Sequence, residues 1–101
     1  MTPDKKQLKK LRGMAHSLKP VVTVGGKGLT ESVFAEIDSA LDSHELIKIK
    51  LPAGPRQVRE SLVNDICQRS RSSFVGMTGR VAITFRKNPD KKNSISLDTT
   101  D

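Results

Sequence analysis

The residues with the clearest capacity for chemistry form the segment 24–30, VGGKGLT. This spacing is that of a GxxG loop with a lysine inside it. Glycine permits positive φ and lets another molecule approach the backbone closely, and we expect Gly25 and Gly28 to use this freedom. A helix that begins after Thr30 adds partial positive charge through its free N–H groups. The loop therefore suits an extended anionic ligand.

Two nucleotide-binding loops do not fit this spacing. A P-loop needs a longer run between its first glycine and Gly-Lys-Ser/Thr, whereas Lys27 stands before the last glycine here. The dinucleotide fingerprint GxGxxG fails because Gly25 and Gly26 are adjacent. The loop instead matches the type with which KH domains clamp a nucleic-acid backbone. A plain strand-to-helix turn that uses glycine for its geometry stays open as the alternative.

Basic charge is concentrated in one part of the chain. The 101 residues carry 18 Lys and Arg against 11 Asp and Glu, a net charge of +7 that fits one nucleic-acid-binding domain. The first 28 residues hold seven of the basic residues and Asp4 as the one acid, whereas residues 31–42 hold four acids and no Lys or Arg. A solvated basic surface is the alternative, but this concentration favours a binding face.

Three helices are expected to position these residues. The first is expected to start at a Thr2 cap and to run to about Leu18, where Lys19-Pro20 stops it. The second is expected to start at a Thr30 cap and to end at His44. The third is expected over about residues 56–69, with a buried stripe formed by Val58, Leu62, Ile66 and Arg69, and with Val63 beside it.

Four strands are expected over residues 21–24, 46–51, 74–77 and 80–86. The first is a β-branched run, typical of a strand that is buried on both faces. In the second, Lys48 and Lys50 point to one face, which we expect to be open to solvent and positively charged. The last two strands form a hairpin around Thr78-Gly79.

The order of these elements, α-β-α-β-α-β-β, predicts a compact α/β fold with three helices and a mixed four-stranded sheet. The strand–helix–strand units favour parallel neighbours, and the hairpin adds an antiparallel member. A single domain is expected over residues 1–97, with Ile95 and Leu97 docked on an edge and a disordered tail over residues 98–101.

The sequence contains no assembled catalytic or metal-binding motif. His16 and His44 lie apart from any nucleophile motif, and Cys67 is the single cysteine, so we expect neither an enzyme nor a cofactor or metal site. No apolar run approaches membrane-spanning length, and no secretory segment is found. A cytoplasmic protein without a membrane partner is therefore expected.

Aromatic residues are few. Phe34, Phe74 and Phe85 all fall on apolar elements, and we expect them in the core. Few aromatic rings are then left to stack on bases, which favours recognition of the backbone and shape of structured RNA. Double-stranded DNA stays open as a ligand, although no helix-turn-helix or other groove-reading motif is found.

Three motifs carry a family resemblance: LKPVV at 18–22, VGGKGLT at 24–30 and HELIKIK at 44–50. Together they resemble the CRM domain, the chloroplast RNA splicing and ribosome maturation domain, and most closely its single-domain bacterial YhbY-like members, over roughly residues 5–86. The resemblance implies a fold similar to the C-terminal domain of bacterial translation initiation factor three, and no catalysis. It also implies binding to ribosomal RNA in precursors of the large ribosomal subunit, through the loop residues Gly25, Gly26, Lys27 and Gly28.

Charge placement extends this site to basic residues outside the loop, namely Lys5, Lys9, Arg12, Lys19, Lys48 and Lys50. The third helix departs from the family pattern. Where the family usually ends it with Thr-Gly, this chain has SRSS at 70–73, so the usual glycine cap is missing and the helix end must be satisfied otherwise. A monomer is expected. The alternative function is a protein-interaction module that uses the acidic second helix, with incidental basic charge.

Overall fold

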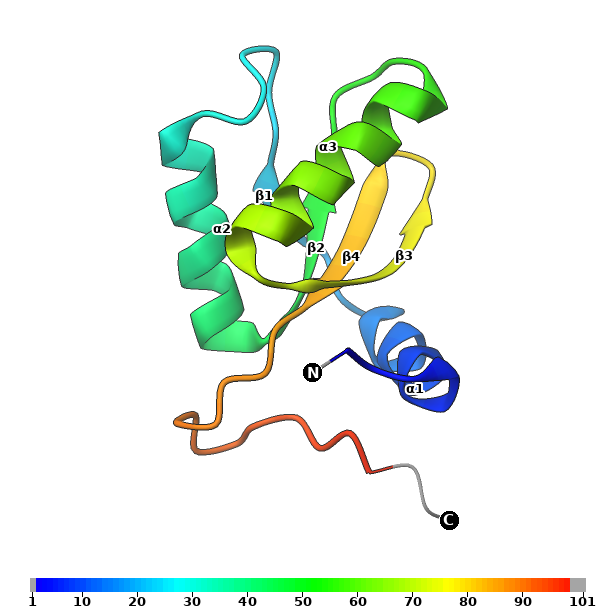
Figure 1. Cartoon of the computed structure of the whole chain (residues 1–101), viewed down its shortest axis with the longest axis vertical. Coiled ribbons are helices and arrows are strands. Elements are labelled where there is room, and N and C mark those ends of the chain that lie inside the picture. Colours follow the sequence, from blue (N-terminus) through cyan, green and yellow to red (C-terminus); the bar gives the residue numbers. More distant parts are fainter. Residues whose placement is uncertain (1, 99–101) are drawn as a thin grey trace.

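The computed structural model describes residues 2–98 and contains the expected three helices and mixed four-stranded sheet (Figure 1). In chain order, the elements are α1 (Lys5–Ala15), β1 (Pro20–Thr23), α2 (Glu31–His44), β2 (Leu46–Lys50), α3 (Arg56–Ser70), β3 (Ser73–Thr78) and β4 (Val81–Phe85). Every strand boundary lies within one residue of its expected position. Residues 99–101 of the expected tail lie outside the described residues.

The sheet has helices on both faces. Its strand order is β1-β2-β4-β3, with β1 parallel to β2 and with β4 antiparallel to β2 and β3. α2 and α3 pack on one face through a core that includes Ile37, Leu41, Ile47, Ile49 and Ile66. α1 packs on part of the other face through a core that includes Leu11, Ala15, Leu46, Val75 and Phe85. Each large apolar side chain buried in this way stabilises the fold by about 1.5–3 kcal/mol.

α1 begins two residues later than expected, because Asp4 and not Thr2 is its cap. The Oδ1 of Asp4 accepts from the N–H of Gln7 (2.9 Å), and the Oε1 of Gln7 accepts from the N–H of Asp4 (2.9 Å). This reciprocal pair is a capping box, which needs Glu or Gln three residues after the cap. Thr2 has Lys5 at that position and cannot form it.

α1 also ends earlier than expected, at Ala15 and not at Leu18. The N–H of His16 donates to the carbonyl of Gly13 (3.3 Å), and the N–H of Leu18 donates to the carbonyl of Ala15 (2.9 Å). These bonds span three residues, so they form tight turns and do not continue the α-helix. Gly13 weakens the last helical turn, and Pro20 requires extended backbone just before it.

β1 was expected to be buried on both faces, and this was wrong. It is an edge strand in which Val22 is 4% exposed and Val21 is 52% exposed. α2 covers the face that carries Val22, whereas α1 packs against β2 and β3 and leaves the other face of β1 open. A short β-branched run fits a half-buried edge strand as well as a central one.

The buried stripe of α3 is rotated from the expected one. Val63, Ile66 and Ser70 are buried, whereas Val58 is 50% exposed and Arg69 is exposed. The expectation was right for Ile66 and Val63 and wrong for Val58 and Arg69, because the packing of the helix on the sheet decides which of its apolar residues are covered.

The backbone groups at the end of α3 form their hydrogen bonds without a glycine cap. The helix extends to Ser70, and Arg71 adopts the left-handed conformation (φ 57°) that glycine usually takes at this position. The N–H groups of Arg71 and Ser72 both donate to the carbonyl of Cys67. The Oγ of Ser70 donates to the carbonyl of Ile66 at 2.6 Å.

The C-terminal segment docks, as expected, but on α1 and not on a sheet edge. Ile95 and Leu97 pack against the apolar core under α1. The Nε2 of Gln7 donates to the carbonyl of Leu97 (3.1 Å), and the Nζ of Lys10 donates to the carbonyl of Ser96 (2.7 Å). One of the α1 lysines is therefore already used to hold this segment.

Candidate nucleic-acid interface

The glycine loop, residues 24–30, projects beyond the sheet at one end of the molecule (Figure 1). The N–H of Gly28 donates to the carbonyl of Gly25 (3.0 Å) and closes a β-turn whose central residues are Gly26 and Lys27. Gly28 has a φ of 74°, as expected, but Gly25 has no positive φ, so the expectation for Gly25 was wrong. Gly28 supplies left-handed backbone where the chain leaves the turn, two residues before the Thr30 cap.

The other two glycines of the loop are not required by packing. Gly25 and Gly26 are exposed, and a Cβ built on either of them would have no heavy atom within 4 Å. Their lack of a side chain leaves bare backbone beside Lys27, whose side chain is exposed. The loop is therefore thin and open, as a clamp on a phosphate backbone requires.

The start of α2 completes the loop. Thr30 caps the helix as expected, since its Oγ1 accepts from the N–H of Val33 at 3.2 Å. Glu31 lies in the first turn, and its carboxylate pairs with Arg69 of α3 at 3.1 Å. This pair offsets part of the negative charge that would otherwise stand beside the loop.

Two further connections lie at the same end of the molecule as the glycine loop (Figure 1). They are the segment 51–55, which follows β2, and the β3–β4 turn. The N–H of Leu51 donates to the carbonyl of Arg80 (2.6 Å), and the Nε of Arg80 donates back to the carbonyl of Leu51 (3.0 Å). The N–H of Val24 donates to the carbonyl of Lys50 (2.8 Å). Arg80, which the sequence pattern did not single out, thus lies near the predicted contact Lys50.

The face of the sheet that carries α1 is partly open. A groove of about 590 Å³ lies on it, which we call the cationic groove. Arg12 of α1, His16 just after α1 and Lys48 of β2 line it, with residues of the other strands. Lys48 is half-buried, and its Nζ donates to the carbonyl of Leu18 at 3.0 Å. Lys50 is exposed on the same face, closer to the glycine loop. The expectation of an open, positive face is confirmed for Lys50, which is exposed. It is confirmed only in part for Lys48, which is half-buried.

The elements that form this surface contain no acidic residue. Residues 5–30, 46–59 and 66–89 include no Asp or Glu. These ranges hold α1, all four strands of the described chain, the glycine loop and the β3–β4 turn. The acids lie on α2 and α3 and in the segments that flank these ranges. We call the surface from the glycine loop through Lys50 to the cationic groove the basic face.

The other predicted contacts lie farther from the loop. Arg12 lines the cationic groove and reaches edge strand β3, where its Nη1 donates to the carbonyl of Val75 at 3.0 Å. Lys5 and Lys9 are exposed on α1, which lies at the opposite end of β1 from the glycine loop (Figure 1). Lys19 lines a separate, mainly apolar pocket between α1 and β1. The structure therefore brings Arg12, Lys48 and Lys50 onto one surface and leaves the other three at its margin.

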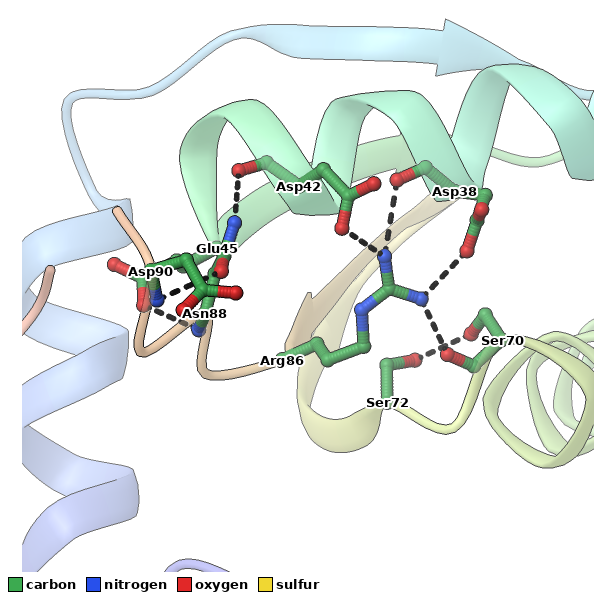
Figure 2. Close-up of polar contacts among 8 residues, drawn as sticks. All are labelled: Asp38, Asp42, Glu45, Ser70, Ser72, Arg86, Asn88 and Asp90. Atoms are coloured by element: carbon green, nitrogen blue, oxygen red, sulfur yellow. Dashed lines mark hydrogen bonds and ion pairs between the residues drawn. The ribbon is translucent and has the colours of Figure 1, made fainter.

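Two exposed acids of α2 are paired with Arg86, which follows β4 (Figure 2). The Nη1 of Arg86 donates to the Oδ1 of Asp38 (2.7 Å) and to the carbonyl of Ser70 (2.7 Å). Its Nη2 donates to the Oδ1 of Asp42 (2.9 Å). Arg86 therefore connects α2 and α3 to the end of the sheet.

This network weakens the alternative function. With Asp38, Asp42 and Glu31 in ion pairs, Glu36 is the acid of α2 that has no ion-pair partner within residues 2–98. A single free carboxylate is a poor docking surface for a basic partner. Three of the four acids of α2 thus contribute ion pairs that connect it to the rest of the fold.

One aromatic residue is not where it was expected. Phe85 is 3% exposed, and the ring of Phe34 is covered by the guanidinium of Arg69 at 3.9 Å. Phe74, by contrast, is 48% exposed on β3. β3 is an edge strand with an irregular register between Phe74 and Gly76, so α3 covers only part of this side chain.

The histidine, cysteine and acidic side chains of residues 2–98 are spread over several elements. Within residues 2–98, no group of three or more His, Cys, Asp or Glu side chains could hold a metal ion. Burial raises the pKa of the Cys67 thiol, against a smaller opposing effect of Ser72, whereas a nucleophile needs a lowered value. None of the helices in this part of the chain has the length and apolar character needed to cross a membrane.

Comparison with known proteins gives one consistent family. The CRS1/YhbY (CRM) domain matches residues 4–86. The "Probable RNA-binding protein PA4753" of Pseudomonas aeruginosa is 42% identical over 96 residues, which cover 95% of this chain and 92% of that protein. An "RNA-binding protein" of Haemophilus influenzae is 40% identical over 91 residues, which cover 90% of this chain and 92% of that protein.

The fold is shared with a solved structure. The solution structure of a hypothetical protein from Staphylococcus aureus matches with a TM-score of 0.80 at 26% sequence identity. The match covers 92% of this chain and 97% of that chain. It confirms the expected α/β fold.

Proposed function

The chain belongs to the CRS1/YhbY (CRM) domain family, as the sequence motifs indicated, and we propose that it binds RNA through its basic face. In this proposal the glycine loop clamps the phosphate backbone, with Lys27 as the charged contact. Lys50, Lys48 and Arg12 hold the strand as it continues into the cationic groove. The names of the relatives support RNA as the ligand, and the charges support this surface.

The observation that carries the proposal is the segregation of charge. Lys and Arg that neutralise phosphates release counterions, and this release drives binding. On the basic face no acid competes for those cations, because α1, the strands and the glycine loop contain none. On the opposite side, an RNA strand would meet the carboxylates of α2, among them Glu36.

We further propose that the RNA is ribosomal RNA in a precursor of the large ribosomal subunit. The support is the family itself, in which the CRM domain takes part of its name from ribosome maturation. In this role the protein acts in the cytoplasm as a monomer, by binding alone and without a cofactor.

Ultraviolet crosslinking in cells tests both parts of the proposal. The crosslinked peptides and the attached RNA are identified from the same sample. We expect peptides from residues 24–30 and from β2, attached to ribosomal RNA and enriched in precursors of the large subunit. Peptides confined to α2, or RNA without enrichment of ribosomal sequences, would contradict it.

A further inference from the structure

We propose that a second groove, on the far side of edge strand β3, binds an unpaired nucleobase. The inference rests on the proposed RNA-binding function, because the base belongs to a strand held on the basic face. The groove has a volume of about 550 Å³, lies between α3 and β3, and is called the base pocket. Its volume is within the usual range for small-molecule sites. Its lining combines an aromatic ring, an amide and cations, namely Phe74, Asn64, Arg12 and Arg56.

Phe74 supplies the stacking surface. Its ring lines the pocket and is the aromatic ring that the fold leaves open, since Phe34 lies under Arg69 and Phe85 is buried. A base that stacks on such a ring gains affinity whatever its identity, because every base has a π-face. Val63 and Met77 extend the apolar wall beside it.

Asn64 and the Arg56–Glu60 pair supply polar groups at the rim. Asn64 is exposed on α3, and its side chain makes no hydrogen bond within residues 2–98. An amide offers both a donor and an acceptor, which matches the edge of a base. Arg56 is paired with Glu60 at 2.9 Å, so this side of the rim is electrically neutral and can accept a base without a phosphate.

The base pocket adjoins the cationic groove. Arg12, Gly76 and Met77 line both of them. The stem of Arg12 crosses β3 at Gly76, where a Cβ would lie 3.3 Å from the Cδ of Arg12. Glycine at this position therefore gives Arg12 its route across the strand. A strand of RNA that leaves the cationic groove would pass Arg12 before its base reaches Phe74.

A nucleotide titration tests the pocket without the rest of the RNA site. The full chain is titrated with AMP and with UMP, and ribose 5-phosphate serves as the control without a base. We expect the NMR signals of the Phe74 ring and the Asn64 amide to shift with the nucleotides and not with ribose phosphate. If these signals stay in place with both nucleotides, or if ribose phosphate moves them equally, the proposal is wrong.

An RNA-binding assay then places the pocket in the larger site. A hairpin with an unpaired 3′ extension is compared with the same hairpin without it. We expect Phe74→Leu to weaken binding of the extended hairpin about tenfold, with unchanged salt dependence, and to leave the blunt hairpin unaffected. Asn64→Ala should act in the same direction. Val58→Ala is the matched control, because Val58 is equally exposed on α3 but does not line the pocket.

Lys27→Ala separates the two claims. If Phe74→Leu binds both hairpins like the wild type while Lys27→Ala weakens both, the base pocket is wrong and the proposed function stands. If Lys27→Ala also binds like the wild type, the loop assignment in the proposed function fails, and the nucleotide titration alone decides the pocket.

Discussion

The guanidinium of Arg86 lies 2.7 Å from the carboxylate of Asp38, and this contact links an exposed acid of α2 to the residue that follows β4. The Arg86 side chain is 19% exposed and also donates to the carbonyl of Ser70. It connects α2 and α3 to the end of β4 and pairs with two exposed acids of α2 (Figure 2). Glu36 is then the acid of α2 without an ion-pair partner within residues 2–98.

Replacement of Arg86 is expected to destabilise the fold. Arg86→Met removes charged hydrogen bonds to two helices and should lower the free energy of unfolding by about 2 kcal/mol. Urea denaturation measures the loss. Arg56→Met is the control, because its ion pair with Glu60 is exposed and should contribute less than about 0.5 kcal/mol. Equal losses in the two variants would show that the network is not structural.

Glu36 gives a clean test of the acidic helix. Glu36→Lys breaks no ion pair found within residues 2–98, whereas a reversal at Asp38 would also disrupt Arg86. We expect Glu36→Lys to leave both stability and ribosome association unchanged, as measured by thermal melting and gradient sedimentation. Loss of the association with normal stability would favour the protein-interaction function.

Glu45 holds the C-terminal segment through a buried carboxylate. It accepts from the N–H of Asn88 (2.7 Å), the Oγ of Ser94 (2.6 Å) and the N–H of Ile95 (2.6 Å). Burial alone would raise the pKa of Glu45, but these bonds and the charge of Lys87 together outweigh it and lower the pKa below its usual value of 4.5.

The lowered pKa of Glu45 predicts the direction of the pH dependence. The unfolded chain binds the proton at a higher pH than the folded chain, so the stability that Glu45 contributes is full above its unfolded pKa and is lost as the pH falls through the folded pKa. Glu45→Gln should cost about 2 kcal/mol at pH 7, and this difference should shrink as the pH falls below 4.5. Chemical denaturation at several pH values measures it. A difference that stays constant down to low pH would contradict the assignment.

Two of the three loop glycines, Gly26 and Gly28, should respond differently to alanine. Gly28→Ala places a Cβ on left-handed backbone and should destabilise the protein by about 1–2 kcal/mol. Gly26→Ala meets open space and should leave the stability unchanged. Thermal melting compares them. Gly26→Asp is then the cleaner charge test, since it should weaken RNA binding at normal stability, and an unaltered affinity would remove Gly26 from the site.

Features that depend on neighbours in sequence could be predicted from the sequence. The Thr30 cap, the hairpin after β3 and the alternation in β2 are of this kind. The packing of α3 and the open face of β1 could not, because each depends on where a helix rests on the sheet. Arg86 and Asp38 are 48 residues apart, and no local pattern links them.

The candidate site was predicted in part. The loop and β2 lysines were found from spacing and alternation, whereas Arg80 and the exposed ring of Phe74 depend on the hairpin and the edge position of β3. The stretches without acids are visible in the sequence. That they form one basic face depends on the topology, which places them together.

The affinity of Lys27→Ala for ribosomal RNA fragments, measured by fluorescence anisotropy at several salt concentrations, tests the central claim most directly. Lys92→Ala is the matched control, because Lys92 is an exposed lysine outside the basic face. We predict that Lys27→Ala weakens binding about three- to tenfold and reduces the slope of log K against log salt by about one, while Lys92→Ala has little effect. Equal effects of the two variants, or wild-type binding by Lys27→Ala at every salt concentration, would contradict the account.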